Sequence, residues 1–62
     1  MNKYHQKLEE GSELGEREIH NLVGKAVTDY SFGVTAGMEE GDREKVEYFK
    51  TKIQEVDKFL YK

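Results

Sequence analysis

The sequence predicts an all-α protein built as an antiparallel helical hairpin, with a short N-terminal helix or arm in front of it. Apolar residues recur at helical spacing from Ile19 onward, and a second set with heptad spacing runs toward the C-terminus. A Glu-Glu-Gly-Asp segment at residues 39–42 separates the two sets. We therefore expect helices at about 16–39 and 43–61, within a hairpin unit of residues 16–62.

The N-terminal unit, residues 1–15, is polar. Tyr4 and Leu8 stand four residues apart, which places them on one face of a short helix that ends near Glu10. Gly11 is suited to terminate that helix, and Ser12 or a neighbour to cap the next one. An isolated helix of this length is marginal in water, so it needs support from the rest of the chain.

The first long stripe has the i, i+3, i+4, i+7 spacing of a core-facing helix. Its members are Ile19, Leu22, Val23, Ala26, Val27 and Tyr30. Beyond it, the alternation of Tyr30, Phe32 and Val34 also fits a strand. We favour helix up to Met38 because the helical period continues unbroken and no second strand of comparable quality is available for pairing. A break near Gly33 is the alternative.

Glycine is the main argument against that continuous helix. Gly24, Gly33 and Gly37 each cost about 1 kcal/mol relative to alanine inside a helix. Gly33, Gly37 and Gly41 are spaced four apart, so on a helix they form a smooth ridge that a neighbouring helix can approach closely. Close packing against a second helix would offset their cost.

The last helix carries the strongest signal. Gly41 is placed to cap the preceding helix in a left-handed conformation, and Asp42 to cap the start of the next. Apolar residues then follow with spacings of three and four, as in bundles and coiled coils. They are Val46, Phe49, Ile53, Val56 and Leu60.

A chain of 62 residues without cysteine is short of stabilising devices. A domain of this size hides only about 60% of the surface of its unfolded chain, and disulfides are excluded. We therefore expect a homodimer, as a four-helix bundle. Truncating a core position to alanine should cost about 2–5 kcal/mol if the side chain is fully buried. The core positions are Ile19, Leu22, Val23, Val27, Phe49, Ile53, Val56 and Leu60.

Three aromatic residues fall outside both apolar stripes and are candidates for binding a partner. They are Phe32, Tyr48 and Phe59. Aromatic side chains are common anchors of interfaces. The alternative is that residues 1–14 fold back and cover some of them. Acidic runs at both ends of the first long helix would steer a partner with a basic surface. Their candidate residues are Glu13, Glu16, Glu39 and Glu40.

Catalytic and metal-binding patterns are absent from the sequence. His5 and His20 lie far apart without ligand spacing, so we expect both to be exposed to solvent. No phosphate-binding loop or nucleophile motif occurs, and we expect no catalytic residue, cofactor or metal. Basic and acidic residues are too mixed for nucleic-acid binding, and a nucleic-acid mimic would need more than a net charge of −3.

The sequence thus predicts a small non-enzymatic interaction module that binds and regulates or inhibits a larger protein. Phage-encoded proteins are one class in which such helical hairpins occur, but composition does not identify a source. A structural or assembly subunit of a cellular or viral complex is the alternative. With no signal peptide and no apolar run of membrane-spanning length, a cytoplasmic protein without membrane contact is expected.

Overall fold

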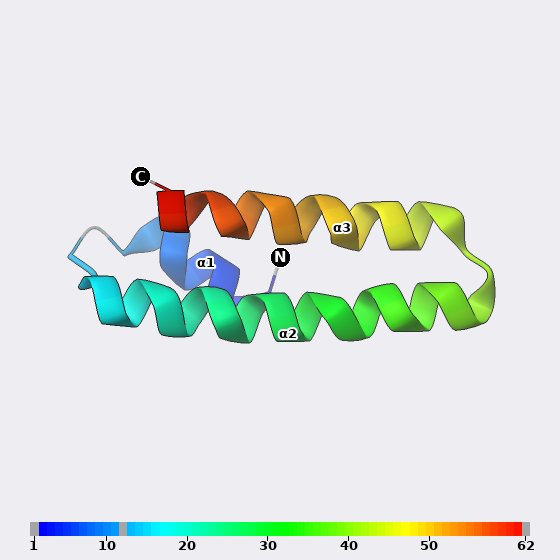
Figure 1. Cartoon of the computed structure of the whole chain (residues 1–62), viewed down its shortest axis with the longest axis horizontal. Helices are drawn as coiled ribbons and strands as arrows, with labels where there is room; N and C mark the ends of the chain where they lie inside the picture. The colour runs from blue at the N-terminus through cyan, green and yellow to red at the C-terminus, as the bar shows by residue number, and fades with distance from the viewer. Residues whose placement is uncertain (1, 12, 62) are drawn as a thin grey trace.

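The computed structural model describes residues 2–11 and 13–61, and the chain is all-helical over these ranges, with no strand. Its elements are α1 (Lys3–Glu10), α2 (Glu16–Glu40), α3 (Arg43–Asp57) and the short 3-10 helix η1 (Lys58–Tyr61). In Figure 1, α2 and α3 run side by side in opposite directions, and α1 lies beside them in the half of the molecule where α2 begins.

The ends of the helices follow local chemistry. The Asn2 side chain accepts a hydrogen bond from the backbone N–H of His5 at 2.7 Å and caps α1. Asp42 caps α3 in the same way, accepting from the N–H of Lys45 at 3.1 Å. Gly41 ends α2 with φ 71°, the left-handed conformation predicted for it. The residue before α2 is Gly15, which supplies no side-chain cap, and Ser12 lies outside the described residues.

α2 is continuous from Glu16 to Glu40, so the helical prediction for the segment around Gly33 is confirmed and the strand alternative is wrong. The reason lies in the packing of the glycines. A Cβ atom on Gly33 would lie 2.6 Å from the ring of Phe49, and one on Gly37 would lie 2.8 Å from Val46. The side chains of α3 occupy the space that side chains at these two positions would need. The close approach predicted for the glycine ridge is confirmed at these two positions.

The C-terminal segment departs from the prediction. The regular α-helix stops at Asp57, and residues 58–61 tighten into η1, whereas a single helix to residue 61 was expected. A final 3-10 turn is a common way for a helix to end. The heptad pattern gives no signal of this change, because Leu60 fits both geometries.

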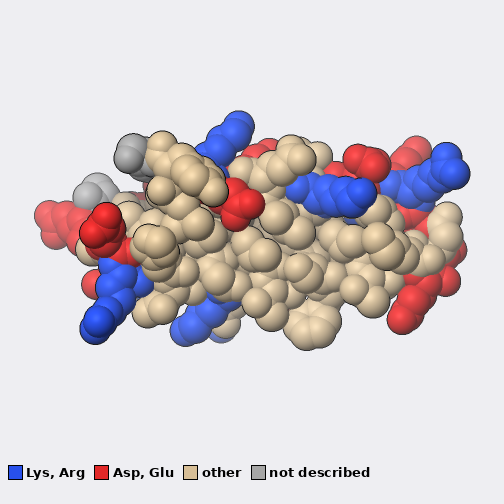
Figure 2. All heavy atoms as spheres, viewed as in Figure 1, with Lys and Arg blue, Asp and Glu red and all other residues tan. Residues whose placement is uncertain are grey.

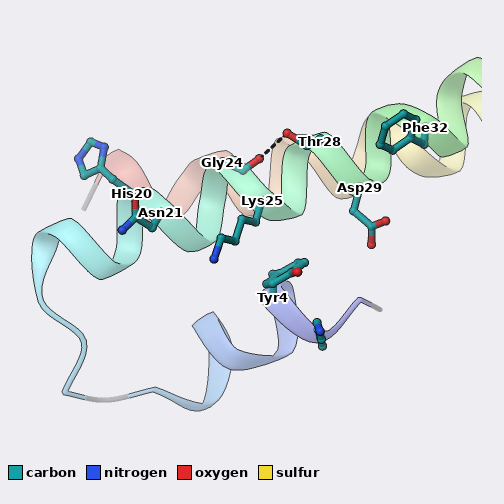
Figure 3. Close-up of a pocket in the computed structure, with 9 residues that line it drawn as sticks. Tyr4, His20, Asn21, Gly24, Lys25, Thr28, Asp29 and Phe32 are labelled. Atoms are coloured by element: carbon teal, nitrogen blue, oxygen red, sulfur yellow. Dashed lines mark hydrogen bonds between the residues drawn. The ribbon is translucent and has the colours of Figure 1, made fainter.

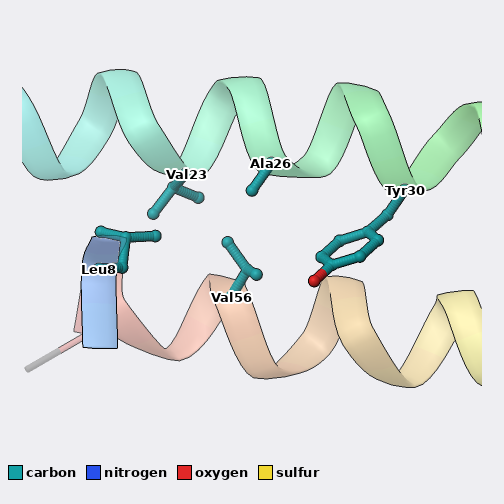
Figure 4. Packing of buried hydrophobic residues seen from close by; sticks show 5 residues of the cluster. All are labelled: Leu8, Val23, Ala26, Tyr30 and Val56. Carbon is teal, nitrogen blue, oxygen red and sulfur yellow. The ribbon is translucent and has the colours of Figure 1, made fainter. Parts of the chain in front are cut away.

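The core is small and draws on all three α-helices (Figure 4). Its buried apolar residues are Leu8, Val23, Ala26, Tyr30 and Val56. The remaining predicted core positions are partly buried and pack against this cluster: Ile19, Leu22, Val27, Phe49, Ile53 and Leu60. The contribution of Leu8 means that the predicted polar arm completes the core.

One sequence prediction about this region is wrong. His5 was expected in solvent, but its exposed fraction is 1%, while His20 is exposed as predicted. The first long stripe gave no indication that its Tyr30 would present a hydroxyl group to another helix. A hydrogen-bonding partner of that kind lowers the free-energy cost of burying a histidine.

Candidate functional site

Two of the aromatic residues singled out in the sequence flank one groove on the surface. Phe32 of α2 is 70% exposed and Tyr48 of α3 is 50% exposed, although both are large and apolar. Between them lies a cavity of about 550 Å³, which we call the aromatic groove. Its lining residues are Asn2, Asp29, Tyr30, Phe32, Gly33, Ala36, Lys45, Tyr48 and Phe49.

The floor and walls of the aromatic groove come from helices that the core already holds in place. Gly33 lacks a side chain, so the ring of Phe49 packs against the backbone of α2 there. Tyr48 stacks edge-on against Phe49, with ring centroids 5.2 Å apart. The ammonium group of Lys52 lies 5.3 Å from the centre of the Tyr48 ring. Tyr48 is therefore positioned on both sides while much of its surface stays open.

Neighbouring groups favour the charged form of Lys52. Partial burial lowers the pKa of Lys52, but the Glu55 carboxylate, 3.4 Å away, and Tyr48 raise it by more, so that the pKa lies above its ordinary value. Lys52 therefore stays protonated at neutral pH. Lys52 does not line the aromatic groove itself, but its positive charge lies beside the exposed ring of Tyr48, which does.

Phe59 differs from the other two aromatic candidates. It is partly buried and packs against the core cluster, and its ring meets that of His5 nearly at right angles with centroids 6.4 Å apart. Phe59 does point away from the heptad seam, but α1 lies on that side. The N-terminal residues therefore fold back and cover Phe59, which was the alternative for some of these aromatics. Phe32 and Tyr48 stay exposed.

A polar network joins α1 to α2 beneath the aromatic groove. The Tyr30 hydroxyl lies 2.8 Å from His5 Nδ1 and accepts a hydrogen bond from the backbone N–H of Asn2 at 3.3 Å. If the hydroxyl donates to Nδ1, then Nε2–H of the histidine can donate to Glu9, 3.2 Å away. Every polar atom of the pair then has a partner. Sequence reasoning missed this network because its two sides lie 25 residues apart.

The acidic candidates do not surround the aromatic groove. Glu13 and Glu16 lie at the end of the molecule where α2 begins, and Glu39 and Glu40 lie at the turn between α2 and α3 (Figure 1). All four are exposed, and Glu40 pairs with Lys45 at 2.9 Å. On the face shown in Figure 2, Asp and Glu stand at both ends and also along the upper part of the middle. The structure separates the acidic and aromatic candidates.

A second groove runs between α1 and α2, and we call it the α1–α2 groove (Figure 3). Its volume is about 870 Å³. The lining residues are Lys3, Tyr4, His20, Asn21, Gly24, Lys25, Thr28, Asp29 and Phe32. Asp29 and Phe32 also line the aromatic groove, so the two grooves meet at these residues. Together they give one path across three helices.

Among residues 2–11 and 13–61, no three histidine, aspartate or glutamate side chains come together in a way that could hold a metal ion. None of the helices described there has both the length and the apolar character to span a bilayer. Comparison of the chain with protein-family models, curated proteins and solved structures finds no match.

Proposed function

We propose that this protein is a non-enzymatic protein-interaction module, and that it binds a larger protein through the aromatic groove. The observation that supports this most directly is the exposure of Phe32 and Tyr48 on two different helices around one cavity. Scattered exposed apolar residues are ordinary. Two rigid aromatic side chains that flank a shared groove have the form of interface anchors, which typically contribute 2 kcal/mol or more to binding.

The fold supports this role because neither anchor belongs to the buried cluster. The core consists of Leu8, Val23, Ala26, Tyr30 and Val56, and the groove is built on top of it. Removal of the Phe32 or Tyr48 ring should therefore leave the melting temperature close to that of the wild type. Binding and stability are separable at these positions, which makes the proposal testable.

The test is affinity capture from the native host with the full chain and four alanine variants. Phe32→Ala and Tyr48→Ala should each lose the partner retained by the wild type. Met38→Ala and Tyr61→Ala are matched controls, because both residues are exposed, at 63% and 83%, and neither lines the aromatic groove. They should retain the partner. Equal retention by Phe32→Ala, Tyr48→Ala and the wild type would refute the proposal.

The alternative role, an assembly subunit of a larger complex, predicts a different stoichiometry. A regulator or inhibitor should be recovered with one large target in a fixed ratio, whereas an assembly subunit should be recovered mainly with many copies of itself. Quantification of the captured proteins by mass spectrometry distinguishes these two roles.

Pairing of two α2–α3 hairpins into a homodimeric four-helix bundle remains a proposal for the form in solution. The small core and the lack of disulfides favour such a dimer, since packing two hairpins together buries both apolar stripes. α1 now covers part of that surface, since Leu8 and His5 are buried and Phe59 packs against them. Equilibrium sedimentation at micromolar concentration should give twice the chain mass if the bundle forms, and a folded monomer would exclude it.

A further inference from the structure

Gly24 is the glycine of α2 that the packing of the chain does not explain. Gly33 and Gly37 are required by the side chains of α3 that touch them. A Cβ atom on Gly24, in contrast, would meet no atom within 4 Å. Glycine is the least favourable residue after proline in the interior of a helix. The absence of a side chain at this position has a use if something outside the chain approaches it closely.

Gly24 lies in the α1–α2 groove, which has aromatic walls. Tyr4 of α1 stands on one side, and Phe32 lies at the end that joins the aromatic groove (Figure 3). From His20 to Phe32 the groove follows twelve residues of α2, which corresponds to about 18 Å at the helical rise. A helix of three to four turns would fill that length.

The edge of the α1–α2 groove is basic, although the chain as a whole has a net charge of −3. Lys3 and Lys25 place their ammonium groups 5.3 and 5.9 Å from the centre of the Tyr4 ring. Within the described residues, neither forms an ion pair with a carboxylate. Lys45 lines the other groove, and the acidic residue that lines either of them is Asp29.

Two acidic residues that pair with lysines of α3 do not line this path. Glu40 and Glu55 each pair with one lysine of α3, at 2.9 and 3.4 Å, and neither lines the two grooves. The end of the path at Tyr4 keeps two lysines against one aspartate. Positive charge is therefore concentrated where the aromatic walls and Gly24 come together.

We infer that the segment recognised at this site is an acidic amphipathic helix of the partner protein, seated in the α1–α2 groove and reaching Phe32. The inference rests on the proposed function and specifies its partner. Gly24 lets the backbone of that helix approach α2, as small residues do where two helices pack closely. Apolar side chains of the helix fill the space between Tyr4 and Phe32, and its carboxylates face Lys3 and Lys25.

Charge argues against a second copy of this chain as the occupant. A two-fold axis that brings one α1–α2 groove onto the other gathers four lysines against two aspartates in the shared interface, at two lysines and one aspartate per copy. The carboxylate that lines the groove is Asp29, which sets one acidic residue against two lysines in each copy. An acidic helix from another protein meets the lysines without this repulsion.

The experiment uses the full chain and two synthetic peptides of sixteen residues as probes. Both peptides carry the same leucine stripe at helical spacing on an alanine background, and they differ only in having glutamate or lysine at the flanking positions. Fluorescence anisotropy gives the two dissociation constants. The glutamate peptide should bind at least tenfold more tightly than the lysine peptide, and its affinity should fall as salt is raised. Lys25→Glu should reverse the preference.

Gly24→Ala is the most discriminating variant, because it should stabilise the fold while it weakens binding of the peptide. The substitution should raise the melting temperature and weaken binding of the glutamate peptide at least tenfold, since the new methyl group blocks close approach. Thr35→Ala is the matched control, as it also adds helix propensity to an exposed position of α2 but lines neither groove. It should leave binding unchanged.

Three results would overturn the inference. They are equal binding of both peptides or a preference for the lysine peptide, full affinity in Gly24→Ala, and no binding of either peptide. None of these results would refute the proposed function, because that is tested separately by capture of the native partner with Phe32→Ala and Tyr48→Ala. Loss of capture in those variants together with failure of the glutamate peptide would leave a partner of different chemistry on the same surface.

Discussion

Near the turn, α2 packs directly on α3, because Gly33 and Gly37 present no side chain and the rings and methyl groups of α3 reach the α2 backbone. In the other half of α2, the cluster around Val23 and Ala26 is completed by Leu8 of the eight-residue helix α1. The half next to the turn depends on two positions that lack side chains, and the other half depends on the docking of a short helix. The two halves should therefore fail in response to different substitutions.

The comparison also bears on function. α1 forms one wall of the α1–α2 groove through Lys3 and Tyr4, so loss of α1 would remove that wall. The aromatic groove depends mainly on α2 and α3 and should persist. Stability in small proteins is distributed unevenly in this manner, and weakly held segments open first.

The largest effect should come from Leu8→Ala. Leu8 is 3% exposed and is the apolar side chain of α1 within the buried cluster. Its truncation should lower the free energy of unfolding by about 2–5 kcal/mol, measured by chemical denaturation. Lys7→Ala, at an exposed position of the same helix, is the control and should change little. Equal stability of the two variants would mean that α1 is not docked and would remove the distinction between the halves of α2.

Gly33→Ala should act in the other half of α2, next to the turn. The added methyl group would lie 2.6 Å from the Phe49 ring, which must shift. Overpacking of this kind costs about 1–3 kcal/mol, and the gain in helix propensity of about 1 kcal/mol offsets only part of it. Denaturation should show net destabilisation, and the tyrosine and phenylalanine signals of the aromatic groove should shift in NMR spectra. A stabilised variant would contradict the close approach of α3.

Tyr30→Phe tests the polar contact between α1 and α2. The hydroxyl bonds to His5 Nδ1 and to the N–H of Asn2, and its removal leaves a buried ring nitrogen without its partner. The cost should be about 1–3 kcal/mol. Hydrogen exchange should become faster in α1 while the half of α2 next to the turn keeps its protection. Uniform acceleration along the chain would show that the two halves unfold as one unit.

Gly24→Ala should have the smallest effect, and in the opposite direction. Because a Cβ atom at this position meets nothing within 4 Å, the substitution adds helix propensity without a clash. The free energy of unfolding should rise by up to about 1 kcal/mol. Set beside Gly33→Ala, the same chemical change on the same helix then has two signs. Destabilisation by Gly24→Ala would show a contact at this position that the packing does not contain.

The sequence by itself determined the helices, because their signals are local. The stripe from Ile19, the cap at Gly41 and Asp42, and the heptad spacing of α3 each depend on residues within one or two turns, and the observed bounds agree with them apart from the final 3-10 turn. The exposure of Phe32 and Tyr48 also followed from helical rotation alone.

Only the tertiary structure decided what α1 does. The spacing of Tyr4 and Leu8 predicts that one face is apolar, but it does not tell which helices that face meets. The burial of His5 depends on Tyr30, 25 residues away, and the cover over Phe59 depends on the position that α1 takes beside η1. The different surroundings of Gly33 and Gly24 were also decided by the tertiary structure. Both are glycines inside one helix, and their difference lies entirely in whether another part of the chain comes close, which local periodicity does not encode.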